Sequence, residues 1–459
     1  MKRKQIAALF FAVMLGLTSL AGCGSSGGDS DSDGSAQNPA DSAESGQAGT
    51  DSGENAAASD GEVVELTFMG WEASPMETAS VTNGIKIFEE LHPNIKVTYT
   101  SGLSGTEYTA KLLSSAASNT LPDIMFMQST DYRTFASKGI IMDITDRFDT
   151  EFPLSDFIDS SAQIMDINGK VYGVSSCTVM PIIYYNKDIF DAAGIEYPSS
   201  DPNDCWTIDE FRDIAKKLTT DEIYGCYGFE SDGMWPALTN ANNGHYFSED
   251  YTAANFDTKE NREVFEVIKA LRVEDGSAPD AATLESVGMS AAQMLQTGKV
   301  AMLCDGSWAL QELAATGMNL GMAPLPSFAN ASSSGQAHLH CISAKTSHPE
   351  EAWEFIKFLS GEEYQGDLIR SGLWMPNRHS WYTEEGLDKW YNEEVHQDCY
   401  MEMLDYFANA QADERAFQMN NACADAIKEE IELYLKEDKD LGEAMSSAQS
   451  RVDAVMAEE

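Results

Sequence analysis

Basic residues are scarce in this chain, which has 29 Lys and Arg against 75 Asp and Glu and a formal net charge of −46. Residues 24–62 contain no Lys, Arg or aromatic residue at all. Residues 63–459 alone carry a formal charge of −40. Because such a charge repels phosphate backbones and anionic lipid headgroups, we expect no nucleic-acid partner and no peripheral docking to a membrane.

The short motifs of common enzyme and nucleotide sites are also missing. The sequence contains no GxSxG, HExxH, GxxxxGKS/T or GxGxxG. His338, His340 and Cys341 lie close together, but a transition-metal site needs further ligands. We therefore predict no enzyme activity, no metal and no cofactor, with a secreted carbohydrate-active enzyme as the rival class because 75 acidic residues could supply paired carboxylates.

Cysteines are few and show no pairing motif. Outside position 23 there are seven, and none forms a CxxC pair. We expect most of them to be small buried apolar residues, and the sequence leaves open whether any two form a disulfide.

Long apolar runs are limited to Ile6–Leu20, which is about five residues shorter than the roughly 20 that a membrane-spanning helix needs. The run follows Lys2, Arg3 and Lys4 and ends in LAGC. This pattern predicts an export signal over residues 1–22. Its end resembles the lipobox of bacterial lipoproteins, which implies that Cys23 carries a lipid; the alternative is an ordinary signal peptide with an incidental cysteine.

The segment that follows, residues 23–62, is rich in Gly, Ser and acidic residues. Such a composition cannot bury enough apolar surface to order itself, so we expect a disordered linker. A flexible coil of this length reaches some 35 Å or more. The sequence thus predicts a folded part that starts near Val63 and is tethered outside a membrane.

The folded part is too long for one ordinary core, so two lobes are expected. Residues 63–71, 95–102 and 123–128 have strand patterns, with helical patterns between them, which indicates an α/β lobe. A second such rhythm begins near residue 171, and Thr207 and Glu210 form a capping-box pattern. The tail predicts two amphipathic helices separated near Asp438.

Four blocks in the same order resemble the bacterial extracellular solute-binding protein family 1. They read LPDIMFMQSTDYRTFASKGIIMDIT, NGKVYGVSSCTVMPIIYYNKDIFDAAGIEYP, GKVAMLCDGSWALQEL and PEEAWEFIKFLSGEE. The resemblance implies a maltose-binding-protein-like fold (type II), in which two α/β lobes, each a mixed sheet flanked by helices, are joined by hinge strands. It also implies a monomer that captures a mono- or oligosaccharide and delivers it to the permease of an ABC importer at the outer face of the cell membrane.

In this scheme the first lobe comprises residues 63–173 and 336–380, and the second comprises 174–335 and 381–459. The ligand lies between the lobes, which close by a hinge motion. We place the hinge strands near Tyr172–Val174 and near Gly335–Gln336. Cys177 and Thr178 depart from the family, which commonly has a proline-containing loop at this point.

A neutral sugar needs aromatic faces for its C–H patches and polar groups for its hydroxyls. Trp71 ends the first predicted strand, at the edge where open α/β sheets bind ligands. The family resemblance adds Trp308, Trp235, Trp374 and Met375. For each Trp, packing in a core or between lobes is the alternative.

Polar candidates occupy loops near the same predicted edges. They are Glu72, Gln128, Ser129, Asp131, Asn186, Asn240, Asn243, Asp305 and Arg378. Asn186 comes from the resemblance, and the Asn cluster is equally typical of turns. A peptide or a cationic solute is the alternative ligand, since it would suit the acidic surface.

Overall fold

The computed structural model describes residues 63–72, 75–103, 105–417 and 421–457. The predicted export signal, Cys23 and the linker to residue 62 lie outside them. Within the described residues, no helix has the length and apolarity needed to cross a membrane.

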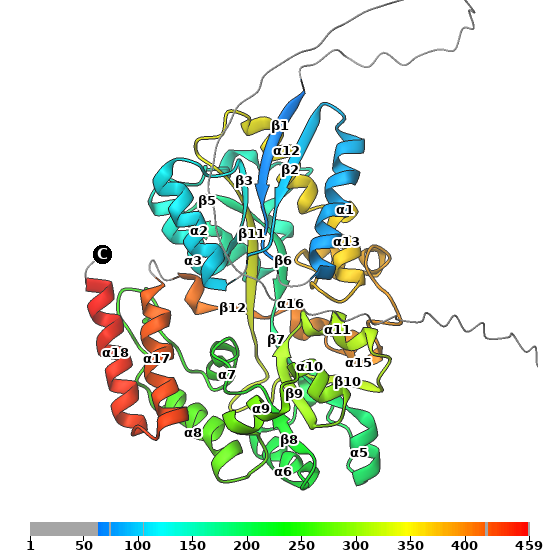
Figure 1. Cartoon of the computed structure of the whole chain (residues 1–459), viewed down its shortest axis with the longest axis vertical. Helices are drawn as coiled ribbons and strands as arrows, with labels where there is room; N and C mark the ends of the chain where they lie inside the picture. The colour runs from blue at the N-terminus through cyan, green and yellow to red at the C-terminus, as the bar shows by residue number, and fades with distance from the viewer. Residues whose placement is uncertain (1–62, 73–74, 104, 418–420, 458–459) are drawn as a thin grey trace, which may run out of the picture. The chain divides into compact units, whose positions relative to one another are not determined.

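A six-stranded sheet, here called the large sheet, contains the predicted βαβ rhythm (Figure 1). Its parallel strands β1, β2 and β3 alternate in sequence with α1 and α2, and α3 follows β3. The antiparallel strand β11 pairs with β3 on one side and with β6 on the other. The short strand β12 pairs in parallel with the first two residues of β11. The bounds are β1 Val64–Met69, α1 Pro75–Leu91, β2 Ile95–Thr100, α2 Gly105–Ser118, β3 Ile124–Gln128, α3 Ser129–Ser137, β6 Gly173–Val179, β11 Ser334–Ile342 and β12 Gln411–Ala412.

Helices flank the large sheet on both sides in Figure 1, with α1 and α13 on one side and α2 and α3 on the other. The strand β3 is buried from Ile124 to Met127, as its continuous apolar sequence predicts. Beyond α3, the short elements η1 Thr145–Arg147, η2 Leu154–Asp156, α4 Asp159–Met165, β4 Asp166–Ile167 and β5 Lys170–Val171 lead to β6. The return segment contains α12 Pro349–Leu359 and α13 Glu362–Arg370.

A four-stranded sheet, here called the small sheet, has the order β10, β7, β9, β8. Strands β8 and β9 are parallel, and β7 is antiparallel to both β9 and β10. The predicted capping box at the start of α6 is confirmed, with Thr207 and Glu210 each accepting from the other's backbone N–H. The bounds are β7 Pro181–Asn186, α5 Lys187–Ala193, η3 Pro202–Asp204, α6 Ile208–Leu218, β8 Tyr224–Tyr227, α7 Trp235–Ala241, α8 Lys259–Val273, α9 Ala281–Val287, α10 Ala291–Gln296, β9 Val300–Gly306, α11 Ala309–Ala315 and β10 Leu320–Ala323.

The chain passes from the large to the small sheet at Met180, between β6 and β7. We predicted this step near Tyr172–Val174. The difference arises because β6 pairs with β11 along its whole length, from Gly173 to Val179, and so stays in the large sheet. The return into the large sheet, at the start of β11, lies within one residue or two of the predicted position.

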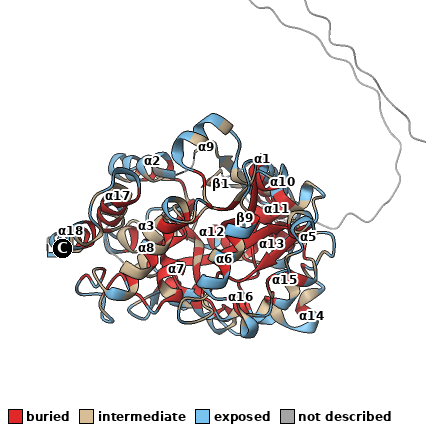
Figure 2. Cartoon of the chain, turned by 90° about the horizontal axis from the view of Figure 1, so that it is seen from below, coloured by how far each residue is buried: buried red, intermediate tan, exposed pale blue. Residues whose placement is uncertain are grey.

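Two hydrophobic clusters form the interior, and buried residues line the strands and the inner helix faces in Figure 2. The second cluster joins the small sheet to the paired helices α17, Ala422–Glu437, and α18, Leu441–Ala457. The predicted break between these helices is confirmed, because α17 ends at Asp438 in the left-handed conformation. The remaining elements of the C-terminal part are η4 His379–Tyr382, α14 Glu384–Leu387, α15 Asp398–Glu402, α16 Leu404–Ala408 and η5 Glu414–Phe417. Six of the seven cysteines outside position 23 are buried, as predicted.

The two histidines of β11 lie among aromatic rings. The His340 ring is 1% exposed and packs edge-on against Phe68 and Phe126, with ring centroids 5.5 and 5.4 Å away. Burial lowers the pKa of His340 to about 3 and that of His338 to about 4. Both rings are therefore neutral in the folded protein at physiological pH.

This burial makes stability depend on pH. The unfolded chain binds a proton on His340 below its ordinary pKa, about 6.5, whereas the folded chain excludes that proton until about pH 3. Stability should fall as pH drops from 7 to 5, by up to about 1.4 kcal/mol per pH unit for each excluded proton. Denaturant melts should show a shallower pH dependence for His340→Phe, which keeps the aromatic packing. His379→Gln, at an exposed position, is the control and should behave as wild type. An equal slope for His340→Phe and wild type would contradict the assignment.

Candidate functional site

The carboxyl ends of strands from both sheets border the point where the chain passes between them. Gln128, the last residue of β3, pairs with His338 of β11, which also pairs with β6. Where β6 ends, Met180 leads directly to Pro181 of β7, and Pro181 pairs with Gly306, the last residue of β9. Ligands of open α/β sheets bind at carboxyl ends of strands. These two edges therefore form the candidate site.

The large-sheet edge carries Trp71 and Glu72, as predicted, both half-buried. The indole of Trp71 packs edge-on against the ring of Tyr108, 5.6 Å between centroids. The Tyr108 hydroxyl lies 2.9 Å from the carbonyl of Met69 and 2.6 Å from that of Phe126. Tyr108 thus ties the ends of β1 and β3 together and supports the indole, which leaves part of Trp71 available to a ligand.

Gln128, Ser129 and Asp131 lie where β3 passes into α3. Gln128 is half-buried, whereas Ser129 and Asp131 are 4% and 3% exposed. The Asp131 carboxylate accepts from the Thr109 hydroxyl at 2.7 Å and from the Asn421 side-chain amide. Burial raises the pKa of Asp131. Its hydrogen bonds join α3 to α2 and α17, so the carboxylate serves packing in this structure and only Gln128 of the three is accessible at the edge.

The small-sheet edge carries Asp305 and Trp308 at the end of β9. The Trp308 side chain is 38% exposed and lies across Gly306, where an added Cβ would be 2.2 Å from the indole. Gly306 N–H donates to the Asp305 carboxylate at 2.7 Å. Burial nevertheless raises the pKa of Asp305 to about 6, and the Glu312 carboxylate acts in the same direction. An accessible indole and a largely buried carboxyl thus lie side by side.

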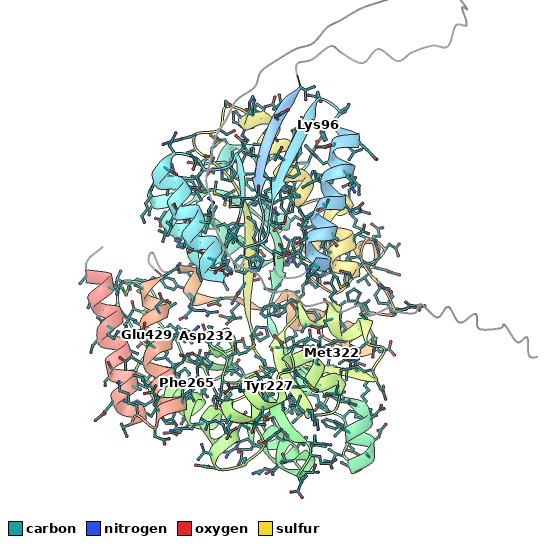
Figure 3. All side chains as sticks on the ribbon, viewed as in Figure 1. Lys96, Tyr227, Asp232, Phe265, Met322 and Glu429 are labelled. Atoms are coloured by element: carbon teal, nitrogen blue, oxygen red, sulfur yellow. The ribbon has the colours of Figure 1, made fainter. Side chains whose placement is uncertain are left out.

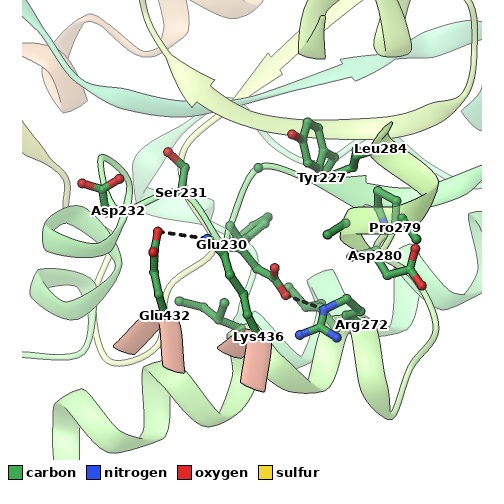
Figure 4. A pocket seen from close by; sticks show the side chains of 17 residues that line it. Tyr227, Glu230, Ser231, Asp232, Arg272, Pro279, Asp280, Leu284, Glu432 and Lys436 are labelled. Atoms are coloured by element: carbon green, nitrogen blue, oxygen red, sulfur yellow. Dashed lines mark hydrogen bonds and ion pairs between the residues drawn. The ribbon is translucent and has the colours of Figure 1, made fainter. Parts of the chain in front are cut away.

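A cavity of about 630 Å³ lies in the small-sheet half of the chain, beginning at the residue that ends β8 (Figure 4). Figure 3 places Tyr227 and Asp232, at the two ends of one wall, in this half. The volume is typical of a small-molecule site. Its lining comprises Tyr227–Asp232, Ile268, Leu271, Arg272, Ala278–Ala282, Leu284, Glu432 and Lys436.

The charges on the cavity wall are mostly paired. Arg272 Nε donates to Glu230 at 2.7 Å, and Lys436 Nζ lies 3.0 Å from Glu432. Asp232 pairs with Lys428 at 3.2 Å. Both basic side chains of the wall therefore already have a carboxylate partner, while the wall offers apolar and aromatic surface beside them. Such a wall suits an uncharged polar molecule better than an anion.

Trp235 and Asn186, which we predicted as ligand-binding, have packing roles in the structure. Trp235 is 1% exposed and packs edge-on against Phe265, 5.4 Å between ring centroids. Asn186 is the N-cap of α5 and accepts from the backbone N–H of Asp188 at 3.0 Å. A ligand cannot reach Trp235 in this arrangement because the second hydrophobic cluster encloses it.

Asn240, near the end of α7, and Asn243, just beyond it, contact the segment that precedes β11. Asn240 donates to the Ser332 hydroxyl at 3.0 Å, and Asn243, at φ +57°, accepts from the Asn330 amide at 2.6 Å. Asn240 borders a second, small cavity of about 70 Å³ at the start of β11. The turn alternative describes Asn243, whereas Asn240 lies within α7 and its side chain contacts Ser332.

Trp374, Met375 and Arg378 hold the return loop against the large sheet. Trp374 and Met375 are 5% and 1% exposed, and the Met375 N–H donates to Thr178 at 3.2 Å. The Arg378 guanidinium lies between the rings of Phe152 and Phe157 at 4.5 and 4.4 Å. Burial lowers the pKa of Arg378 to about 10. A ligand cannot contact these three side chains in this structure, because they are buried between the return loop and the core.

Sequence reasoning missed most of the cavity. Tyr227 could have been found, because an aromatic residue before Gly228 ends a strand in the same way that Trp71 does, and Gly228 has φ +103°. Arg272 and Lys436 lie within amphipathic helices that are distant in sequence. No local pattern indicates that these two side chains line one cavity.

Comparisons with known proteins agree with this architecture. The chain is 26% identical to an uncharacterized lipoprotein of Streptomyces antibioticus, over 64% of this chain and 66% of the relative. It is 23% identical to the galactooligosaccharide-binding protein of Bacillus subtilis, over 53% and 57%, and 29% identical to the sn-glycerol-3-phosphate-binding periplasmic protein of Agrobacterium fabrum, over 46% and 50%. The matched regions thus span less than two thirds of the length of each of these relatives.

Solved structures show the same fold. An ABC substrate-binding protein of Listeria monocytogenes, in complex with cycloalternan, superposes with a TM-score of 0.75 at 23% identity, over 86% of this chain and all of that one. The model of the family described as bacterial extracellular solute-binding protein matches residues 73–366, more than half of the chain. The two-lobed α/β architecture, the facing strand ends and this match lead to one conclusion: the chain belongs to the bacterial extracellular solute-binding protein family.

Proposed function

We propose that this protein binds an uncharged mono- or oligosaccharide between the strand ends of its two sheets and delivers it to the permease of an ABC importer. The single observation that carries the proposal is the accessible indole of Trp308, which lies across Gly306 beside the Asp305 carboxyl. An indole offers an apolar face for sugar C–H groups, and a carboxylate accepts hydrogen bonds from hydroxyls. Trp71 and Glu72 supply the same pair of chemistries from the other edge.

The relatives support a sugar but also offer a second ligand. One relative is named for galactooligosaccharides and one solved neighbour holds cycloalternan, whereas another relative is named for sn-glycerol 3-phosphate. The Asp305 carboxyl at the small-sheet edge favours the uncharged candidate, since its ionised form would repel an anion there. A peptide or a cationic solute is the remaining alternative within binding proteins.

Capture follows from a shift between conformations. A sugar that contacts both edges binds more tightly when the edges approach each other, so ligand favours the closed form by the difference in affinity. The chain passages between the sheets at Met180 and at the start of β11 supply the hinge. The permease then recognises the closed form. The protein acts in this scheme as a monomer and without catalysis.

The anchoring belongs to the same proposal. The LAGC sequence ending at Cys23 and the relative named a lipoprotein support lipidation at the outer face of the cell membrane. A tether there keeps the binding protein near its permease and leaves the folded part free to turn.

A thermal-shift panel tests the function. A bound ligand raises the melting temperature in proportion to the logarithm of its concentration over Kd. We expect a neutral oligosaccharide to raise it and sn-glycerol 3-phosphate and basic dipeptides to leave it unchanged at the same concentration. Chromatography of the incubated sugars should show no cleavage products. A shift with glycerol phosphate alone, or release of shorter sugars, would overturn the proposal.

Trp308→Ala should weaken binding of the sugar found in this panel. The lost stacking contact and buried area correspond to about 1–3 kcal/mol, or roughly ten- to a hundredfold in Kd. Isothermal titration calorimetry measures this change directly. Tyr391→Ala is the matched control, because Tyr391 is similarly exposed at 39% but follows α14 and belongs to neither strand edge. Equal affinities of Trp308→Ala and wild type would remove Trp308 from the site.

Affinity should also depend on pH through Asp305. The free carboxyl titrates near pH 6, and sugar hydroxyls that donate to its ionised form lower its pKa in the complex. Binding is then strongest above pH 6 and falls as pH decreases, on the order of tenfold between pH 7 and pH 5. Asp305→Asn should bind more weakly at pH 7 and show a flat profile over this range. A wild-type affinity that is the same at both pH values would exclude this role.

A further inference from the structure

We propose that residues 411–417, here called the connecting arm, position the cavity loop 228–234 relative to the large sheet, and that Arg415 is the positioning residue. The arm comprises β12 and η5. The inference concerns how the wall of the 630 Å³ cavity is held in place, and its consequence for ligand affinity rests on the proposed function.

The arm is fixed to the first residues of β11. Strand β12 pairs with Ser334 and Gly335, and the Asp413 N–H donates to the Gly335 carbonyl at 3.0 Å. The side-chain amide of Gln336 donates to the Asp413 carboxylate at 3.0 Å. Asp413 therefore moves with the strand that enters the large sheet.

An ion pair connects this anchor to the cavity loop. Arg415 Nη2 donates to Asp413 at 2.7 Å, and the two side chains are 12% and 3% exposed. Arg415 Nη1 donates to the backbone carbonyl of Asp232 at 3.3 Å. Asp232 is a wall residue of the 630 Å³ cavity. The guanidinium thus bridges the Asp413 carboxylate of the arm, which is hydrogen-bonded to β11, and the backbone of the loop. A planar group with several donors can do this.

The other side of the arm contacts both halves of the chain. Glu414 accepts from the backbone N–H of Tyr246 at 2.7 Å, on the small-sheet side. Arg133 of α3 donates to the Ala416 carbonyl at 3.1 Å and lies over the Phe417 ring. The arm is consequently held by α3 and β11 of the large-sheet half and by the loops around α7 of the small-sheet half.

These contacts form a continuous path from Gln336 through Asp413 and Arg415 to Asp232. Buried charges cost desolvation free energy, and a buried pair is a poor choice for stability alone. Its directional hydrogen bonds, in contrast, fix distances. When the two sheets change their relative position, the path transmits the displacement of β11 to the cavity wall.

Arg415→Lys tests the bridge, because one ammonium keeps the charge beside Asp413 but does not reproduce the planar fork. Hydrogen–deuterium exchange of the ligand-free protein should be at least about fivefold faster for amides in residues 228–234. The Kd for the sugar found in the panel should rise about tenfold. Arg212→Lys is the matched control: Arg212 of α6 makes a similar ion pair with Asp275, 2.7 Å from Nε, outside the arm. It should leave exchange in 228–234 unchanged.

Gln336→Met provides the second variant. It keeps the volume of the side chain, leaves the ion pair intact and removes only the hydrogen bond to Asp413. Faster exchange in 228–234 is expected although Gln336 donates to Asp413 and not to the loop. Wild-type exchange in this segment for Gln336→Met and for any folded Arg415→Lys would overturn the inference. Hydrogen–deuterium exchange is measured without ligand. Absence of sugar binding in the thermal-shift panel would therefore contradict the proposed function without affecting this test of the arm.

Discussion

The pairing of β11 on both of its sides is the constraint on which the rest of the structure depends. Its register with β3 places Gln128 beside His338, and its register with β6 brings the chain to Met180 at the same level. From there β7 starts directly opposite the end of β9. A slip of one residue would turn each strand's side chains to the opposite face and separate the two edges. The geometry of the candidate site thus follows from backbone hydrogen bonds between the strands.

Several carboxylates beside the cavity and the arm have basic partners, whereas Asp305 has none in the part of the chain that the structure describes. The chain is strongly acidic, and basic residues near the cavity and the arm form ion pairs with carboxylates, such as Arg272–Glu230 and Arg415–Asp413. Asp305 differs from these pairs, because among the described residues no Lys or Arg lies within ion-pair distance of it. Burial raises its pKa, and the Glu312 carboxylate acts in the same direction.

Local signals in the sequence predicted most helices and strands, but not the residue at which the chain passes from the large sheet to the small sheet. The capping box at Thr207 and the break at Asp438 are local hydrogen-bond and backbone effects, so they could be read directly. The step at Met180 could not, because β6 and β7 are buried throughout and no change of pattern separates them. Trp71 was selected as a candidate from a predicted strand end and Trp308 from the family resemblance, whereas Trp235, selected from the same resemblance, packs in a core. The arm has no periodicity, and its contacts to β11, α3 and the cavity loop join residues that are distant in sequence.

The distribution of tryptophan has an optical consequence. Six of the eight indoles, those of Trp206, Trp235, Trp353, Trp374, Trp381 and Trp390, are buried, and only Trp71 and Trp308 retain solvent contact. Emission from the six enclosed rings provides a constant background, while the two at the strand edges sense any molecule that displaces water from them. If the proposed site is correct, these two indoles report its occupancy without a label, and each strand edge contributes one chromophore.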